Sequence, residues 1–94
     1  MIRGNSLSKI GRDEEAITSY EKILELQPGK DKESVAWQSR GLILDHLGRY
    51  EEAIFSYEKA LEFRPNESIL WFQHGNKLYE LYRYGEAIVS YDKA

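Results

Sequence analysis

The side chains best suited to chemistry are two histidines and two pairs of acidic residues. His46 and His74 do not stand at metal-ligand spacing with other donors, and the sequence has no cysteine, which excludes disulfides, thiol catalysis and cysteine-based zinc sites. The pairs at residues 14–15 and 51–52 are glutamates, a pattern that can serve acid–base catalysis. They also fit the first turn of a helix, where negative charge offsets the helix dipole, and we favour that interpretation.

No other catalytic pattern is present in the sequence. It contains no phosphate-binding glycine loop, no His-Glu-x-x-His, no calcium-binding loop and no serine elbow. The triplet at residues 66–68 matches a glycosylation acceptor, but it suits the start of a helix better, with Asn66 as the N-cap. We therefore expect no enzyme, no cofactor and no metal site.

The composition is that of a mildly acidic chain. Its 94 residues have a formal net charge of −3, an asymmetry too small to indicate a nucleic-acid or membrane-surface protein. No apolar run approaches membrane-spanning length, and the first ten residues lack the apolar centre of a signal peptide. We expect one domain over residues 1–94, in the cytoplasm, with neither nucleic acid nor membrane as its partner.

The elements that must position any site are written three times in the sequence. "GRDEEAITSYEKILELQP" begins at Gly11, "GRYEEAIFSYEKALEFRP" at Gly48 and "YRYGEAIVSYDKA" at Tyr82. The segments that precede these copies also align with one another, on Arg3, Arg40 and His74. The repeating unit therefore consists of two halves.

Each half places its apolar residues at helical spacing, so each repeat is predicted to be two helices. Gly11 and Gly48 stand between the halves and suit the left-handed residue that ends a helix, while Pro28 and Pro65 separate successive units. Because a helix pair cannot bury its apolar face alone, successive pairs must stack.

A glycine recurs within each first helix, although glycine there costs about 1 kcal/mol relative to alanine. The recurrence indicates a close approach between the two helices of a pair. The expected contacts join these glycines to alanines of the following helix, namely Gly4, Gly41 and Gly75 to Ala16, Ala53 and Ala87.

In the order and spacing of these residues the chain resembles the tetratricopeptide repeat family. The most complete match is in the second repeat, at Trp37, Gly41, Leu44, Gly48, Tyr50, Ala53, Tyr57, Ala60 and Pro65. The resemblance implies an all-α fold, a right-handed α-solenoid of antiparallel helix pairs. It divides the chain into a partial repeat at residues 1–30, a full repeat at 31–67 and a truncated repeat at 68–94.

The junction between the first two repeats departs from the pattern. Three extra residues separate Pro28 from Trp37, so we expect the Trp37 helix to begin about one turn early, capped near Asp31. Ile23 also replaces the alanine found in the other two repeats. Together these changes predict that repeats one and two pack differently from repeats two and three.

Two further departures concern the turns. Tyr82 stands where the other repeats have glycine, and because a left-handed conformation is costly for tyrosine, we expect a turn of a different shape there. Asp13 stands where the others have tyrosine, and it is expected to cap the second helix of its repeat.

The resemblance implies that the first helix of each pair lines a concave groove that takes extended or helical peptides. The first-helix residues away from the core are the candidate protein-binding residues: Asn5, Gln38, Leu42, Asp45, Phe72, Gln73, Asn76 and Tyr79. Some members of the family hold a free carboxylate with lysine, arginine and asparagine, but the basic places hold Met1, Ile69 and Gln73 here. A peptide with apolar anchors fits better, unless Phe72 and Tyr79 cover a flanking repeat or a neighbouring molecule.

Two functions of different classes stay open. The first is a scaffold that binds a peptide or protein segment in the groove without catalysis. The second is a structural element that forms homo-oligomers by end-to-end stacking of its terminal helices. The second follows from the third repeat, which stops at Ala94 in mid-helix and is expected to leave an open face that another surface covers.

Overall fold

The chain is helical along the part that the structure describes. The computed structural model describes residues 2–94, and their side chains from residue 11 onward. The helices are α1 (Ile2–Glu25), α2 (Lys30–His46), α3 (Tyr50–Phe63), α4 (Ser68–Glu80) and α5 (Tyr84–Lys93), and no strand occurs between residues 2 and 94. The expected all-α fold is confirmed.

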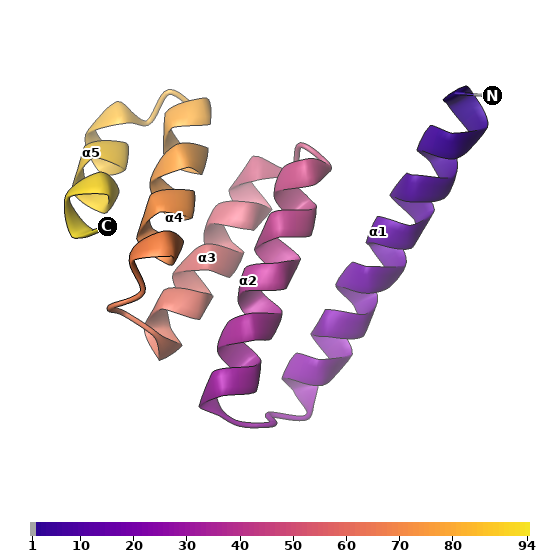
Figure 1. The fold of residues 1–94 in the computed structure, drawn as a ribbon, viewed down its shortest axis with the longest axis horizontal. Coiled ribbons are helices and arrows are strands. Elements are labelled where there is room, and N and C mark those ends of the chain that lie inside the picture. The colour runs from indigo at the N-terminus through magenta and orange to yellow at the C-terminus, as the bar shows by residue number, and fades with distance from the viewer. Residues whose placement is uncertain (1) are drawn as a thin grey trace.

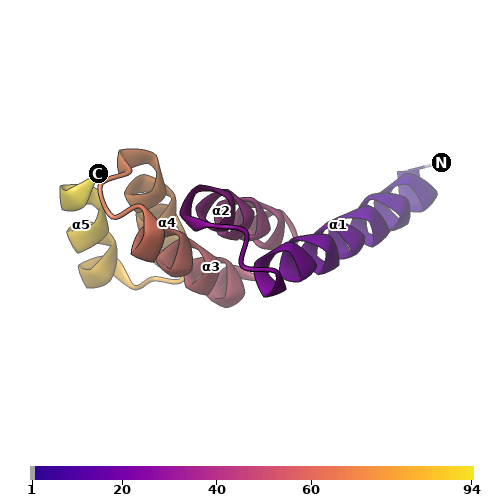
Figure 2. The same cartoon turned by 90° about the horizontal axis from the view of Figure 1, so that it is seen from below.

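The helices lie in a row of antiparallel neighbours (Figure 1). α2 packs on α3 and α4 packs on α5, while α1 lies beside α2 at one end of the row. The view turned by 90° shows α2 and α4 on the same side of α3 (Figure 2). The first helices of the two complete pairs therefore share one side of the molecule.

Two clusters of buried side chains join the helices. In the larger cluster, Ile17 of α1, Leu44 of α2 and Tyr57 of α3 pack together and are almost wholly buried. In the smaller cluster, Ile54 of α3 packs against Leu78 of α4. Because each cluster takes side chains from several helices, the core belongs to the stack rather than to any single pair.

The recurring glycine does mark a close approach between the helices of a pair. A Cβ at Gly41 would lie 2.8 Å from the ring of Tyr57, and a Cβ at Gly75 would lie 2.9 Å from the ring of Tyr91. The groups nearest to these two glycines are therefore tyrosine rings rather than the expected alanines, because an aromatic ring fills the space that glycine leaves. Gly4 lies outside the residues whose side chains are described.

One polar arrangement ties the second repeat to the first. Arg40 of α2 donates hydrogen bonds to Ser56 Oγ of α3 at 2.5 Å and to the Glu21 carboxylate of α1 at 3.2 Å. Its side chain is only 12 % exposed. A guanidinium buried to this degree needs hydrogen-bond partners, and Arg40 finds them on α3 and α1. Arg40 therefore connects three helices.

The same arrangement ties the third repeat to the second. His74 takes the place of Arg40, with Nδ1 2.7 Å from Ser90 Oγ of α5 and Nε2 3.0 Å from the Glu58 carboxylate of α3. A basic side chain of each first helix thus contacts a serine of its own pair and an acid of the preceding helix pair.

The two turns within the pairs have the same shape. Gly48 has a φ of 78° and Tyr82 a φ of 63°, both in the left-handed region. At both turns the following N–H donates to the carbonyl five residues back, at 2.8 Å for Arg49 and 2.9 Å for Arg83. The expectation of a different turn at Tyr82 is wrong, because these hydrogen bonds and the packing of α4 on α5 hold tyrosine in a conformation that it disfavours.

α1 is one uninterrupted helix from Ile2 to Glu25. The expected turn at Gly11 is therefore wrong, and so are the expected cap at Asp13 and the first-turn position of residues 14–15, which lie within the helix. No neighbouring side chain lies within 4 Å of a Cβ placed on Gly11. Among the described residues, therefore, no contact at this position favours a turn over the helix. Residues 51–52, in contrast, lie in the first turn of α3 as expected.

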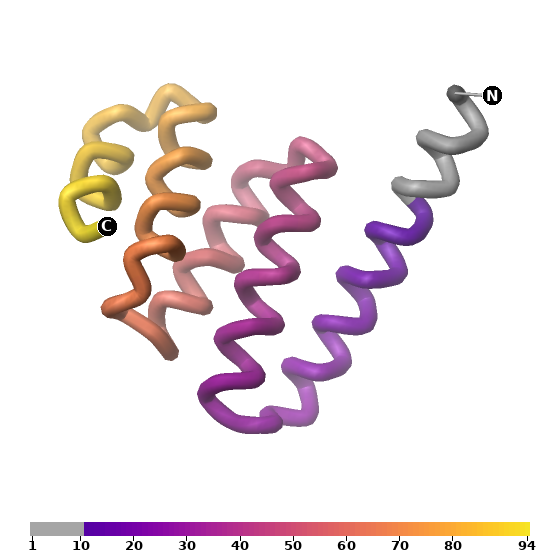
Figure 3. Tube along the Cα trace, in the orientation of Figure 1, coloured from indigo at the N-terminus to yellow at the C-terminus, as the bar shows by residue number. Residues whose placement is uncertain are grey.

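α2 begins about one turn early, which confirms the expectation for this junction. It starts at Lys30, seven residues before Trp37, whereas α4 starts at Ser68, three residues before Trp71. The chain passes from α1 into α2 through a short connection at residues 26–29 (Figure 3). The extra residues thus lengthen a helix rather than a loop.

The helix caps differ from those expected. The N-cap of α2 is Gly29, and Asp31 lies in the first turn, where its carboxylate pairs with Arg64 at 2.8 Å. The N-cap of α4 is Glu67, because Asn66 belongs to the turn that precedes the helix. Neither N-cap residue makes a side-chain hydrogen bond to its helix.

Candidate functional site

Exposed apolar side chains of α2 and α4 gather on the side that these helices share. Leu42 is 45 % exposed on α2, while Phe72 and Tyr79 are 53 % and 56 % exposed on α4. We name this surface the α2–α4 face and define it by Val35, Gln38, Leu42, Asp45, Ile69, Phe72, Gln73, Asn76 and Tyr79. It contains the sequence-predicted site residues except Asn5, which lies outside the residues whose side chains are described.

Polar side chains of this face are bonded across the two helices. Gln38 Nε2 of α2 donates to Gln73 Oε1 of α4 at 3.1 Å. Lys77 Nζ of α4 lies 2.5 Å from Asp45 Oδ1 of α2 and 4.9 Å from the ring centre of Tyr50 on α3. Gln38, Asp45 and Gln73 were predicted to bind a ligand. In the structure their side chains form hydrogen bonds between neighbouring repeats.

Two aromatic side chains of α4 pack on tyrosines of α5. The ring of Phe72 lies 5.9 Å from that of Tyr91, whose hydroxyl donates to Asn76 Oδ1 at 2.6 Å. The ring of Tyr79 lies 5.1 Å from that of Tyr84. Such contacts fix the orientation of the half-exposed rings, which lowers the entropy lost when a partner covers them.

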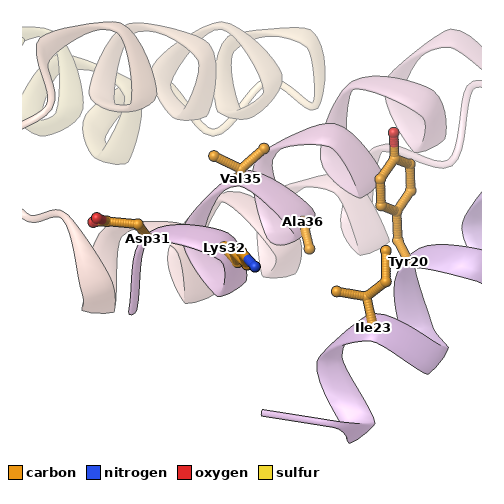
Figure 4. Close-up of a pocket in the computed structure, with 6 residues that line it drawn as sticks. All are labelled: Tyr20, Ile23, Asp31, Lys32, Val35 and Ala36. Carbon is orange, nitrogen blue, oxygen red and sulfur yellow. The ribbon is translucent and has the colours of Figure 1, made fainter. Parts of the chain in front are cut away.

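A pocket of about 340 Å³ opens between α1 and α2 (Figure 4). Tyr20 and Ile23 line it from α1, and Ala36 lies opposite them on α2. Its walls are almost wholly apolar. Val35 belongs both to this pocket and to the α2–α4 face, so the pocket adjoins that face.

Sequence reasoning did not assign two groups of residues to the site. Lys77 was not included because it lies one residue away from the predicted stripe of α4. Its separation from Asp45 along the sequence is close to the length of one repeat, which could have suggested the pair. The α1–α2 pocket had a signal in Ile23, the large residue that replaces alanine. The three extra residues of α2 were a second signal, because Asp31 and Lys32 of that added turn line the pocket.

Perturbed titrating groups lie away from the α2–α4 face. The hydrogen bond from Arg49 lowers the pKa of the Glu52 carboxyl at the start of α3. Burial raises the pKa of the Tyr57 hydroxyl in the core. Across the described residues, no three histidine or acidic side chains gather as a metal site, and no helix is long and apolar enough to cross a membrane.

Comparison with known families agrees with this architecture. Two models of the tetratricopeptide repeat match the chain, one at residues 1–30 and the other at residues 34–67. Together they cover more than half of the sequence. No curated protein matches the chain. The repeated antiparallel pairs and the two family matches lead to the same conclusion, that the chain belongs to the tetratricopeptide repeat family.

Proposed function

We propose that the chain is a non-catalytic scaffold that binds a peptide or protein segment on the α2–α4 face. Tetratricopeptide repeats generally mediate interactions between proteins. One observation carries the proposal for this face. Leu42, Phe72 and Tyr79 remain about half exposed there, while the polar side chains around them already bond to one another.

The chemistry of the face favours a partner with apolar anchor residues. A large aromatic side chain buries roughly 150–250 Å² when fully covered. Half of that area is still available on Phe72 or Tyr79, and at about 25 cal/mol per Å² its burial contributes roughly 2–3 kcal/mol. The apolar pocket beside Val35 offers room for one further anchor.

The α2–α4 face has few groups that could bind a free carboxylate. Lys77 is the basic residue nearest the predicted stripe, and it is engaged by Asp45. Ile69 and Gln73 supply no charge. Since a carboxylate is held best by charge-assisted hydrogen bonds, a peptide should bind equally well with a free or an amidated C-terminus.

The test is selection of peptides from a displayed library on the full chain, followed by titration of synthetic versions. We expect Phe72→Ala or Tyr79→Ala to raise the Kd at least about thirtyfold, which corresponds to the roughly 2 kcal/mol or more of an interface hot spot. Phe55→Ala is the matched control, because Phe55 is 49 % exposed but lies on α3. Equal binding by all three variants, or tighter binding of the free acid than of the amide, would contradict the proposal.

A further inference from the structure

Three exposed tyrosine rings gather where α4 turns into α5. Tyr79 lies in the last turn of α4, Tyr82 in the turn between the helices and Tyr84 at the start of α5. The ring centre of Tyr84 lies 5.1 Å from that of Tyr79 and 6.1 Å from that of Tyr82. The three residues are 56 %, 78 % and 47 % exposed in chain order. We name them the tyrosine cluster, and through Tyr79 it adjoins the α2–α4 face.

The ring of Tyr82 is required neither by the turn nor by the core. Glycine serves at the equivalent turn, where Gly48 adopts the same left-handed conformation without strain. The two turns lie along one edge of the row of helices (Figure 1), and Gly48 is exposed there although α4 packs beside α3. Tyr82 is therefore exposed because of the edge on which it lies, and its ring is available to a partner.

The structure already places a cation on an equivalent tyrosine. Lys77 Nζ lies 4.9 Å from the ring centre of Tyr50, and the same ammonium group pairs with Asp45. In the repeat alignment these two positions correspond to Tyr84 and Tyr79, so both carry rings of the tyrosine cluster in the third repeat. Since the face of an aromatic ring attracts a cation within about 6 Å of its centre, the cluster has the chemistry of a cation-binding surface.

The charges beside the cluster are mainly acidic. Glu80 follows Tyr79 in the sequence and is exposed. Arg83, which stands between the other two tyrosines in the sequence, pairs with Glu86 at 2.5 Å and with Glu51 at 3.4 Å. One arginine thus accompanies three carboxylates. This excess of negative charge favours a basic group on the rings over an acidic one.

We propose that the partner bound on the α2–α4 face places a lysine or arginine side chain on the tyrosine cluster. The inference rests on the proposed function and adds to it the chemistry of the partner. The partner has apolar anchors for Leu42 and Phe72, with a basic residue near the turn between α4 and α5. Because ring faces hold a cation without accepting a hydrogen bond, the surface also accepts a fully methylated lysine.

The first test selects peptides from one displayed library on the full wild-type chain and on the double variant Tyr82→Gly with Tyr84→Leu. We expect lysine or arginine at a fixed spacing from the apolar anchors on the wild type, and no such enrichment on the variant. Circular dichroism checks that the variant keeps its helices. Apolar anchors without a basic residue, or equal enrichment on both chains, would overturn this inference while the proposed function stands. A library that yields no binder would overturn both.

The second test titrates one selected peptide that has lysine at the basic position. Replacing this lysine by uncharged norleucine should raise the Kd for the wild type about two- to fivefold, the range of an exposed cation–π contact. Trimethyl-lysine should bind as well as lysine. On the double variant the norleucine and lysine peptides should bind equally. Tyr84→Phe is the matched control, because it keeps the ring and should keep the preference for lysine.

Three results of these titrations would contradict the proposal. Equal binding of the lysine and norleucine peptides to the wild type shows that no cation is recognised. A preference for lysine that persists in the double variant places the cation elsewhere. Weaker binding of trimethyl-lysine shows that a hydrogen-bonded ion pair, rather than the faces of the rings, holds the ammonium group.

Discussion

Alanine at Gly11 should stabilise the protein, whereas alanine at Gly48 should destabilise it. The two glycines occupy the same place in the repeated sequence. Gly11 lies within the continuous helix α1, while Gly48 has a φ of 78° at the turn between α2 and α3. A Cβ at either position meets nothing within 4 Å. The difference between the variants therefore isolates the backbone conformation.

The magnitudes follow from the conformation of each residue. Replacing an exposed glycine within a helix by alanine gains about 1 kcal/mol. Placing a side chain in the left-handed region costs roughly 1–2 kcal/mol. The free energies of unfolding of the two variants should thus differ by about 2–3 kcal/mol, with the wild type between them. In a domain of this size, 1 kcal/mol corresponds to a shift in Tm of roughly 4–8 °C.

The assay is urea unfolding followed by circular dichroism, with the slope m compared among the three proteins. An unchanged m shows that the midpoint reports stability alone. If Gly11→Ala lowers the free energy of unfolding as much as Gly48→Ala does, then Gly11 forms a turn and the continuous α1 is incorrect. The same experiment thus decides between the repeat pattern of the sequence and the helix found in the structure.

Three further predictions concern a turn, the glycines of the core and an exposed ion pair. Tyr82→Gly should raise the free energy of unfolding by about 1 kcal/mol in urea titrations, because it relieves a left-handed tyrosine. Gly41→Ala should lower the free energy of unfolding by about 1–2 kcal/mol, because overpacking against the buried ring of Tyr57 exceeds the gain in helix propensity. Gly75→Ala should lower it less, because the ring of Tyr91 that it meets is only partly buried. Arg49 lowers the pKa of Glu52 in the folded state, so the stability that the Glu52 carboxylate contributes is lost as pH falls through that pKa. The urea midpoint of Glu52→Gln should therefore fall less than that of the wild type between about pH 7 and about pH 3, which is roughly one unit below the ordinary glutamate pKa.

The sequence predicts α2 to α5 well because each has its own helical period and is bounded by residues that favour the end of a helix. Tight turns and prolines separate these segments, and the three extra residues before Trp37 correctly indicate a longer α2. The capping residues were harder to predict. Asp31 can cap a helix or pair with a distant arginine, and only the fold brings Arg64 close enough to decide between these roles.

The errors at Gly11 and Tyr82 have a common physical origin. A local signal states what a residue prefers, while packing of the flanking helices decides what it adopts. Gly11 permits a turn, yet the helix continues through it, and among the described residues no group lies within 4 Å of a Cβ placed there. Tyr82 disfavours a turn, yet it adopts one because α4 and α5 pack on each other. Neither outcome can be obtained from the residue alone.

The same reasoning separates two kinds of residue on the α2–α4 face. Helical periodicity indicates which residues share the face, but it does not show which of them bond to one another. Two hydrogen bonds, Gln38 to Gln73 and Lys77 to Asp45, join positions about one repeat apart. The stacking of repeats therefore already occupies these polar groups. Their loss should weaken the junction between repeats as well as any binding. Recognition therefore depends on the apolar residues that the stack leaves exposed, which are the residues that a partner can cover without breaking an existing hydrogen bond.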